Sequence, residues 1–190
     1  MEPIEQIKED LKSTLSEKRY IHSLGVMDMC VHLAKIYNVN EEDAKLAGIL
    51  HDVAKEMPDE EMFKYAEENN IELTEIEKVN TKILHGKIGA DIAIKKYGVN
   101  ENVANAIKYH TTTNEKMDDL AKIVFVSDKI ELNRTSTNYD IDYERFVAEK
   151  DLNTVMLIIL NMTINKLVSK GSIINLDTVK TRNAILMGKF

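Results

Sequence analysis

Apolar residues recur at three- and four-residue spacing along nearly the whole chain, and this helical period limits the possible folds more than any other feature. The first apolar positions that show the spacing are Ile4, Ile7, Leu11 and Leu15. Such spacing predicts amphipathic helices that bury one face. The chain shows no convincing alternation of apolar and polar residues that would predict a strand. Its many Ala, Leu, Ile, Lys and Glu residues also favour helices. The sequence therefore predicts an all-α protein.

Cap signals divide this pattern into separate helices. Asn40 and Asn100 are suited to begin helices, and Gly98 to end one. The predicted helices cover a first segment from Ile4, then 18–37, 44–54, a segment after Pro58, 85–97, 101–110, 117–132, a long helix over 143–169, and a last one from about 176. With 190 residues, we predict one domain over 1–190. Its polar connectors are 111–117 and 133–142.

Charge and composition restrict the partners and the location. A net charge of −7 argues against a nucleic-acid partner, because the phosphate backbone would repel the protein. The acidic N-terminal segment does not resemble a signal peptide, and the apolar run 155–160 is too short to span a bilayer. The single cysteine, Cys30, fits a reducing compartment. We therefore predict a cytoplasmic protein with no membrane partner.

The segment AGILHDVAKEMP, residues 47–58, places His51 and Asp52 side by side among apolar residues. Burying a carboxylate without a partner costs several kcal/mol or forces it to take up a proton. Asp128 repeats the pattern in KIVFVSDKIEL, and three more histidines lie on or at the ends of other predicted helices: His22, His85 and His110. Imidazoles and carboxylates are the ligands of iron, manganese and zinc. The set therefore predicts a metal site.

Purely structural roles are the alternative for these polar residues. A single histidine on a mixed helix face is most often structural, and His32, which has no comparable neighbours, is interpreted in this way. The buried acids could form ion pairs with Lys55 and Lys129, although such pairs often add little stability. Ion pairs would leave four histidines without a role. Adjacent helical side chains diverge by about 100°, so His51 and Asp52 suit two different ions.

The order H…HD…D resembles that of the HD-domain phosphohydrolases, whose two-metal members carry extra histidines between. The segments RYIHSLGV, AGILHDVAK, LHGKIGA, AIKYHTTT and VSDKIELNR are similar to the YqeK family of symmetrical bis(5′-nucleosyl)-tetraphosphatases. The resemblance covers residues 19–134, and the C-terminal helices over 143–190 are compatible with it. It implies an HD-domain helical bundle that cleaves diadenosine tetraphosphate into two ADP molecules. It also implies a homodimer.

The resemblance further implies a centre of two metal ions, divalent or trivalent and most consistent with iron. These ligand types also accept manganese or another transition metal. One ion would be held by His22, His51, Asp52 and Asp128, and the second by Asp52, His85 and His110, with Asp52 between them. Two such ions can share and deprotonate a water molecule, and the resulting hydroxide would attack phosphorus in line with the leaving oxygen.

The chain departs from the family pattern at two places. Thr113 and Asn114 follow the fourth histidine of the set, where the family usually has glycine, and Leu132 stands where it usually has proline. Neither change removes a ligand. Both affect the shape of the loops and therefore the fit of the substrate.

Cationic and hydroxyl side chains near these motifs are candidates for binding phosphate. Lys55 lies four residues after His51, Arg19 lies three before His22, and Arg134 follows Asp128. Thr111 and Thr112 are candidate hydrogen-bond donors, and the connector 133–142 is a candidate wall for the second nucleoside. The catalytic group predicted from the motifs is His51, Asp52 and Lys55. No residue is assigned as the acid that protonates the leaving group.

Two other functions remain open at this point. An HD phosphohydrolase for another nucleotide, such as a deoxynucleotide or a guanosine alarmone, would use the same ligands. A helical module that binds a nucleotide or a protein without catalysis would be expected to have lost ligands, and all six positions are present.

Overall fold

The computed structural model describes residues 3–134 and 140–190, and within these ranges it contains helices and no strand, which confirms the all-α prediction. The elements are α1 (Ile4–Thr14), α2 (Glu17–Tyr37), α3 (Glu41–Leu50), α4 (Asp59–Glu68), α5 (Glu75–Val79), the short 3-10 helix η1 (Thr81–Ile83), α6 (His85–Tyr97), α7 (Glu101–Tyr109), α8 (Asp119–Ile130), α9 (Ile141–Ala148), α10 (Leu152–Ser169) and α11 (Leu176–Leu186). Their common core is consistent with one domain, which stays a prediction.

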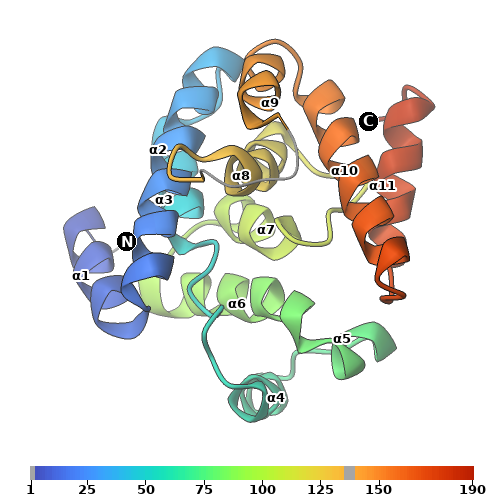
Figure 1. The fold of residues 1–190 in the computed structure, drawn as a ribbon. Helices are drawn as coiled ribbons and strands as arrows, with labels where there is room; N and C mark the ends of the chain where they lie inside the picture. The colour runs from blue at the N-terminus through green and yellow to red at the C-terminus, as the bar shows by residue number, and fades with distance from the viewer. Residues whose placement is uncertain (1–2, 135–139) are drawn as a thin grey trace.

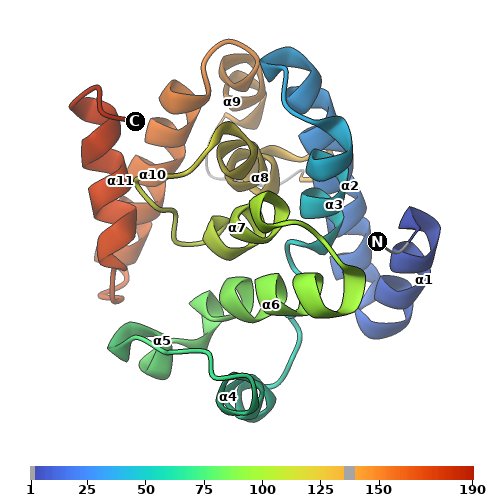
Figure 2. The ribbon, with the colours of Figure 1, turned by 180° about the vertical axis from the view of Figure 1, so that it is seen from behind.

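Helices α7 and α8 lie at the centre of the molecule (Figure 1). α2 and α3 pack on one side of this centre, and α10 packs on the other and carries α11 on its outer face, as the view from behind also shows (Figure 2). The apolar side chains of α8, among them Ile123, Val124 and Ile130, are inaccessible to solvent. A functional side chain on α8 is therefore held by helices on several sides.

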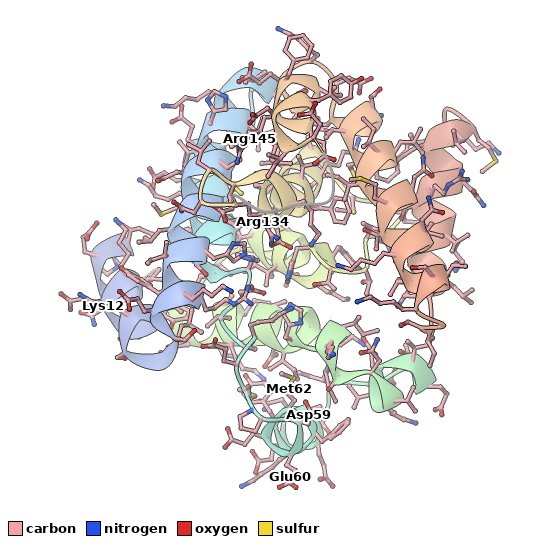
Figure 3. The ribbon with its side chains drawn as sticks, in the orientation of Figure 1. Lys12, Asp59, Glu60, Met62, Arg134 and Arg145 are labelled. Atoms are coloured by element: carbon pink, nitrogen blue, oxygen red, sulfur yellow. The ribbon has the colours of Figure 1, made fainter. Side chains whose placement is uncertain are left out.

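Helix α4 forms a second, smaller apolar cluster with α6. Met62 and Ala66 of α4 contact Leu84 and Ile88, and Ala54 completes the group. Figure 3 shows Met62 and its neighbours on α4 at the end of the molecule remote from Arg134. This cluster holds the chain between α3 and α6, so the residues that follow His51 are fixed at both ends.

Local cap signals locate several helix ends correctly. The side chain of Asn40 accepts a hydrogen bond from the backbone N–H of Asp43, and that of Asn100 accepts one from Val103. Gly98 ends α6 in the left-handed region with φ of 67°, where glycine has no steric penalty. These predictions depended on short-range interactions alone, and they are confirmed.

The predicted continuation of the third helix to Ala54 is wrong, because α3 ends at Leu50. The side chain of His51 donates from Nδ1 to the carbonyl of Gly48 at 2.8 Å. In a continued helix that carbonyl would accept from the N–H of Asp52. The chain instead forms tight turns, in which Lys55 donates its N–H to the carbonyl of Asp52. The histidine that serves the site therefore also ends the helix.

The long helix predicted over 143–169 is two helices, α9 and α10. Asp151 breaks it, because its side chain accepts from the backbone N–H groups of Asn153 and Thr154 and so caps α10. Helix α5 was not predicted, although it has a capping box formed by Thr74 and Glu77. Of the connector 133–142, residues 135–139 lie outside the described residues, so its role as a wall stays a prediction.

Helix α10 is long and apolar enough to cross a membrane by length and composition alone, and the apolar run 155–160 is only part of it. Its buried side chains, including Val155, Met156 and Leu160, belong to the main apolar core. The central helix of a soluble protein passes the same test, so this feature is weak evidence for a membrane span.

Gly48 allows α3 to approach α2 closely. A Cβ atom at this position would lie 2.7 Å from the Cα atom of Met27, which is backbone and cannot rotate away. We expect Gly48→Ala to lower the free energy of unfolding by about 1–3 kcal/mol, the usual cost of overpacking. Urea denaturation measures this, with Lys45→Ala, at a half-buried position of the same helix, as control. A Gly48→Ala variant as stable as the parent would contradict the packing described.

Candidate metal centre

Five helices bring the six predicted ligands together in the interior. His22 lies on α2, His51 and Asp52 follow α3, His85 is the first residue of α6, His110 ends α7, and Asp128 lies on α8. All six residues are buried, with exposed fractions between 0% for His51 and 9% for His22. Residues that are up to 106 positions apart in the chain therefore meet at one point.

The carboxylate of Asp52 lies at the centre of this cluster, with its two oxygens facing different histidines. Its Oδ1 atom is 3.2 Å from Nε2 of His85 and 3.5 Å from Nε2 of His110. Its Oδ2 atom is 3.4 Å from Nε2 of His51 and 3.9 Å from Nε2 of His22. The cluster is thus divided into two halves that share Asp52.

Asp128 completes the half that contains His22 and His51. Its Oδ1 atom is 3.0 Å from Nε2 of His22 and 3.8 Å from Nε2 of His51. The ligand atoms of these three residues lie within 4.8 Å of one another, and so do those of His51, Asp52 and His110. Each group therefore has the compactness that a single metal ion requires, and the second group takes one histidine from each half of the cluster.

Three of the histidines are oriented by the backbone. Nδ1 of each donates to the carbonyl oxygen three residues earlier, at 2.6–2.8 Å: His51 to Gly48, His85 to Lys82 and His110 to Ile107. A histidine that carries its proton on Nδ1 presents a lone pair on Nε2. Metal-binding histidines are held in this way. All three Nε2 atoms point into the cluster.

These lone pairs have too few proton donors around them. Nε2 of His85 and Nε2 of His110 are 3.1 Å apart, although the Nδ1 contacts leave neither with a proton to donate. Nε2 of His51 is buried and has no hydrogen-bond partner among the described residues. An unpaired buried polar atom is costly. Cations between the imidazoles and carboxylates would satisfy all of these atoms, so the residues fit a metal centre.

The ionisation states of Asp52, Asp128 and His85 fit metal binding, whereas Asp128 and Glu131 outweigh burial and raise the pKa of His22. Burial opposes the charge on Asp52, but His51, His110 and His85 outweigh it and hold the pKa of this carboxyl well below its usual range. For Asp128, Lys129 and His22 likewise outweigh burial and lower the pKa. Burial lowers the pKa of His85 to about 4. Carboxylates and neutral imidazoles are the forms that bind metals.

The predicted cations surround the cluster. Nη1 of Arg19 is 2.6 Å from Oδ2 of Asp52. Nζ of Lys55 lies 3.2 Å from Nε2 of His85, and burial lowers the pKa of this ammonium group. Arg134 donates from Nε to the carbonyl of Asp128 at 2.8 Å. Each of the three predicted cations therefore contacts a predicted ligand.

The two predicted threonines are placed differently. Oγ1 of Thr111 lies 3.0 Å from Nε2 of His110 and 3.3 Å from Nε2 of His85, inside the cluster. Thr112 instead accepts a hydrogen bond at its backbone carbonyl from the hydroxyl of Thr178 on α11. Thr113 has a left-handed backbone with φ of 62°, which a β-branched residue adopts at a cost and glycine does not. This explains why glycine suits that position.

A cavity of about 630 Å³ lies beside the half of the cluster that contains His22. Its lining includes the cations Lys18, Arg19 and Arg134, together with Glu131 and Asn133. Figure 3 shows Arg134 over the middle of the molecule, with Arg145 above it. Three cations stand here against two carboxylates, those of Glu17 and Glu131, so the lining has a small excess of positive charge in a protein whose net charge is −7.

Glu131 is a site residue that was not predicted from the sequence. Its Oε1 atom lies 3.2 Å from Nδ1 of His22, and the side chain is buried. The available signal was its position three residues after Asp128, which places both acids on one side of the chain. His32, by contrast, pairs with Glu149 on the surface at 2.8 Å, in agreement with a structural role.

Ion pairs account for part of the cluster only. Lys129 contacts Asp128, and Arg19 contacts Asp52, so both acids have a cationic partner. Lys55, however, faces His85 instead of an acid. Lys55 and Thr111 are the donors within reach of His85 and His110. The buried Nε2 of His51 has no partner among the described residues, which favours a metal ion there.

Comparison with known proteins agrees with this geometry. The sequence profile of the HD domain matches residues 19–133, the stretch that carries every predicted ligand. The chain belongs to the HD-domain family. HD-domain hydrolases bind divalent metals, and the His/Asp groups of this HD domain suit such ions.

Two relatives of this HD-domain protein match it over nearly their whole length and share one description. Proteins of Bacillus subtilis and Halalkalibacterium halodurans, each described as a symmetrical bis(5′-nucleosyl)-tetraphosphatase, are 33% and 35% identical over 94% and 93% of this chain, and over 95% and 94% of their own. A crystal structure from Clostridium acetobutylicum, described as an HD superfamily hydrolase involved in NAD metabolism, covers both chains completely with a TM-score of 0.95 and 38% identity.

The low pKa of His85 makes stability depend on pH. An unfolded histidine takes up a proton near pH 6.5, whereas buried His85 does so at about 4. The unfolded chain then binds more protons, so this residue lowers the free energy of unfolding as the pH falls from 6.5 towards 4. We expect His85→Gln to flatten this dependence in metal-free protein, and Ser169→Ala, which changes an exposed residue without a titrating group, to leave it unchanged. Urea unfolding at several pH values measures both; identical slopes in parent and His85→Gln would contradict the burial argument.

Proposed function

We propose that this HD-domain protein hydrolyses diadenosine tetraphosphate symmetrically, giving two ADP molecules, at the cluster around Asp52. The observation that carries the proposal is the placement of the Asp52 oxygens, each of which faces a different set of inward-pointing imidazoles. The relatives named as symmetrical tetraphosphatases match over nearly the whole chain and support the choice of substrate.

The cluster would hold two metal ions, iron by preference and manganese or another transition metal as alternatives. His22, His51, Asp52 and Asp128 would bind the first, and Asp52, His85 and His110 would bind the second. When bound, the ions supply a water nucleophile that is activated at neutral pH, together with positive charge that offsets the phosphates. His51 and Asp52 are catalytic in this account because they contact the reacting centre.

Cationic side chains and one hydroxyl group would bind the phosphates of the substrate. Arg19 now pairs with Asp52, and a phosphate oxygen would take over part of that contact. Arg134 stands at the cavity mouth and can donate two N–H groups to one phosphate, as guanidinium groups commonly do. Lys55, the third catalytic residue of this proposal, adds charge on the side of His85. Thr111 would donate its hydroxyl proton to phosphate there.

The wider setting of the protein is also a proposal. We infer a cytoplasmic homodimer that takes a dinucleoside polyphosphate and uses neither nucleic acid nor membrane as a partner. The positive cavity mouth on an acidic protein supports a small polyanion as substrate, because the rest of the surface would repel a long phosphate backbone.

A second candidate is hydrolysis of a different nucleotide, such as a deoxynucleotide or a guanosine alarmone. The description of the Clostridium acetobutylicum neighbour, which refers to NAD metabolism, keeps this candidate in view. A substrate panel separates the two. A higher kcat/KM for a mononucleotide than for diadenosine tetraphosphate would favour the second candidate.

The proposed cleavage is tested by product analysis with diadenosine tetraphosphate. We expect ADP as the only nucleotide product. Asp52→Asn should lower kcat at least about 100-fold, since loss of a group that merely supports a metal ligand already costs about 10–100-fold. His32→Gln, a surface histidine, is the control and should keep parental activity. Formation of ATP and AMP, or full activity in Asp52→Asn, would contradict the proposal.

Binding of phosphate by Arg134 is tested separately. Arg134→Ala removes a charge-assisted hydrogen bond, which contributes about 1.5–3 kcal/mol, so KM should rise about 10-fold or more. Arg182→Ala is the matched control, because Arg182 bonds Asn161 between α10 and α11. Metal content is measured in both variants, since Arg134 also contacts Asp128. An unchanged KM in Arg134→Ala would exclude the role.

A further inference from the structure

His22 is oriented differently from the other three histidines of the cluster. Those three donate Nδ1–H to backbone carbonyls within their own turns. Nδ1 of His22 instead faces Oε1 of Glu131, which lies 109 residues further along the chain. Its orientation therefore depends on tertiary packing and not on the local backbone.

Glu131 is itself tightly held. Its side chain is 2% exposed, and Oε2 accepts the backbone N–H of Asn133 at 2.6 Å. Its own carbonyl accepts from Nη2 of Arg145 at 2.8 Å and from the N–H of Arg134 at 3.1 Å. Arg145 belongs to α9 and lies close to Arg134 in Figure 3. Contacts other than the one to His22 therefore hold Glu131 in place.

Helix α2 provides space for this carboxylate at Gly25, three residues after His22. A Cβ atom at position 25 would collide with Oε2 of Glu131 and would lie 2.7 Å from Nδ2 of Asn133. Residues three apart on a helix share a face. The absence of a side chain at Gly25 thus makes room for the carboxylate that contacts His22.

We propose that Glu131 is a positioning residue, which accepts the Nδ1 proton of His22 and so directs the Nε2 lone pair towards Asp52 and Asp128. This inference rests on the proposed metal centre. Carboxylates that hold a metal-binding histidine in this way fix its tautomer and raise its basicity. Glu131 itself does not contact metal or substrate in this account.

The test is the affinity for Mn²⁺, measured by calorimetry on metal-stripped full-length protein. Both oxygens of Glu131 accept N–H groups, so Glu131→Gln must turn its NH₂ group towards one of two donors. We expect Mn²⁺ binding about 10–100-fold weaker, as for other residues that support metal ligands. Glu149→Gln, which removes a glutamate–histidine contact on the surface, should change the affinity less than about twofold, since exposed pairs contribute little.

A double variant separates positioning from a general effect on the fold. If Glu131 acts through His22, adding Glu131→Gln to His22→Ala should weaken Mn²⁺ binding no further than His22→Ala alone. Additive losses, or parental affinity in Glu131→Gln, would overturn the inference. A parent protein that binds no Mn²⁺ would overturn the proposed metal centre, and this inference with it.

Gly25→Ala gives an independent variant if Glu131→Gln does not fold, which thermal melting of the metal-free protein reveals. It keeps the carboxylate in the chain but displaces it with the new methyl group. We expect weaker Mn²⁺ binding here too, and parental affinity in a folded Gly25→Ala protein would count against the positioning role.

Discussion

A single buried carboxylate, that of Asp52, sets the constraint on which the rest of the structure depends. A charge at 2% exposure is tolerated only with compensating partners. The guanidinium of Arg19 is one such partner. Four imidazoles surround the carboxylate, and their inward Nε2 atoms would bind the metal ions that balance the rest of the charge. The packing of α2, α3, α6, α7 and α8 around this point therefore forms the site as well as the apolar core.

The burial of Asp52 among four histidines also determines which chemistry the site can perform. Because Nδ1 is occupied in each of the four imidazoles, the Nε2 atoms converge where donors are few, and metal ions would satisfy them. Glu131 contacts His22 at the end of α8, and Arg145 of α9 donates to the carbonyl of Glu131, so α9 is connected to the cluster through these two residues. The cations at the cavity mouth would then allow an acidic protein to accept a polyphosphate.

Sequence patterns predicted those features that depend on neighbouring residues. Asn40, Asn100 and Gly98 act within one turn, so the helix ends that they set could be read directly. His51 and Asp52 were conspicuous because polar groups interrupted an apolar run. Glu131 was missed because an acid near a helix end is usually solvated, and only tertiary packing buries it against His22. The end of α3 was misplaced because the His51 side chain takes the carbonyl that would continue the helix.

The central claim is that Asp52 lies between two metal ions. Anomalous X-ray scattering from crystals of the protein loaded with iron or manganese tests it most directly. We expect two peaks, one beside Oδ1 of Asp52 near His85 and His110, and one beside Oδ2 near His22, His51 and Asp128. A single peak, or metal bound away from Asp52, would contradict the claim.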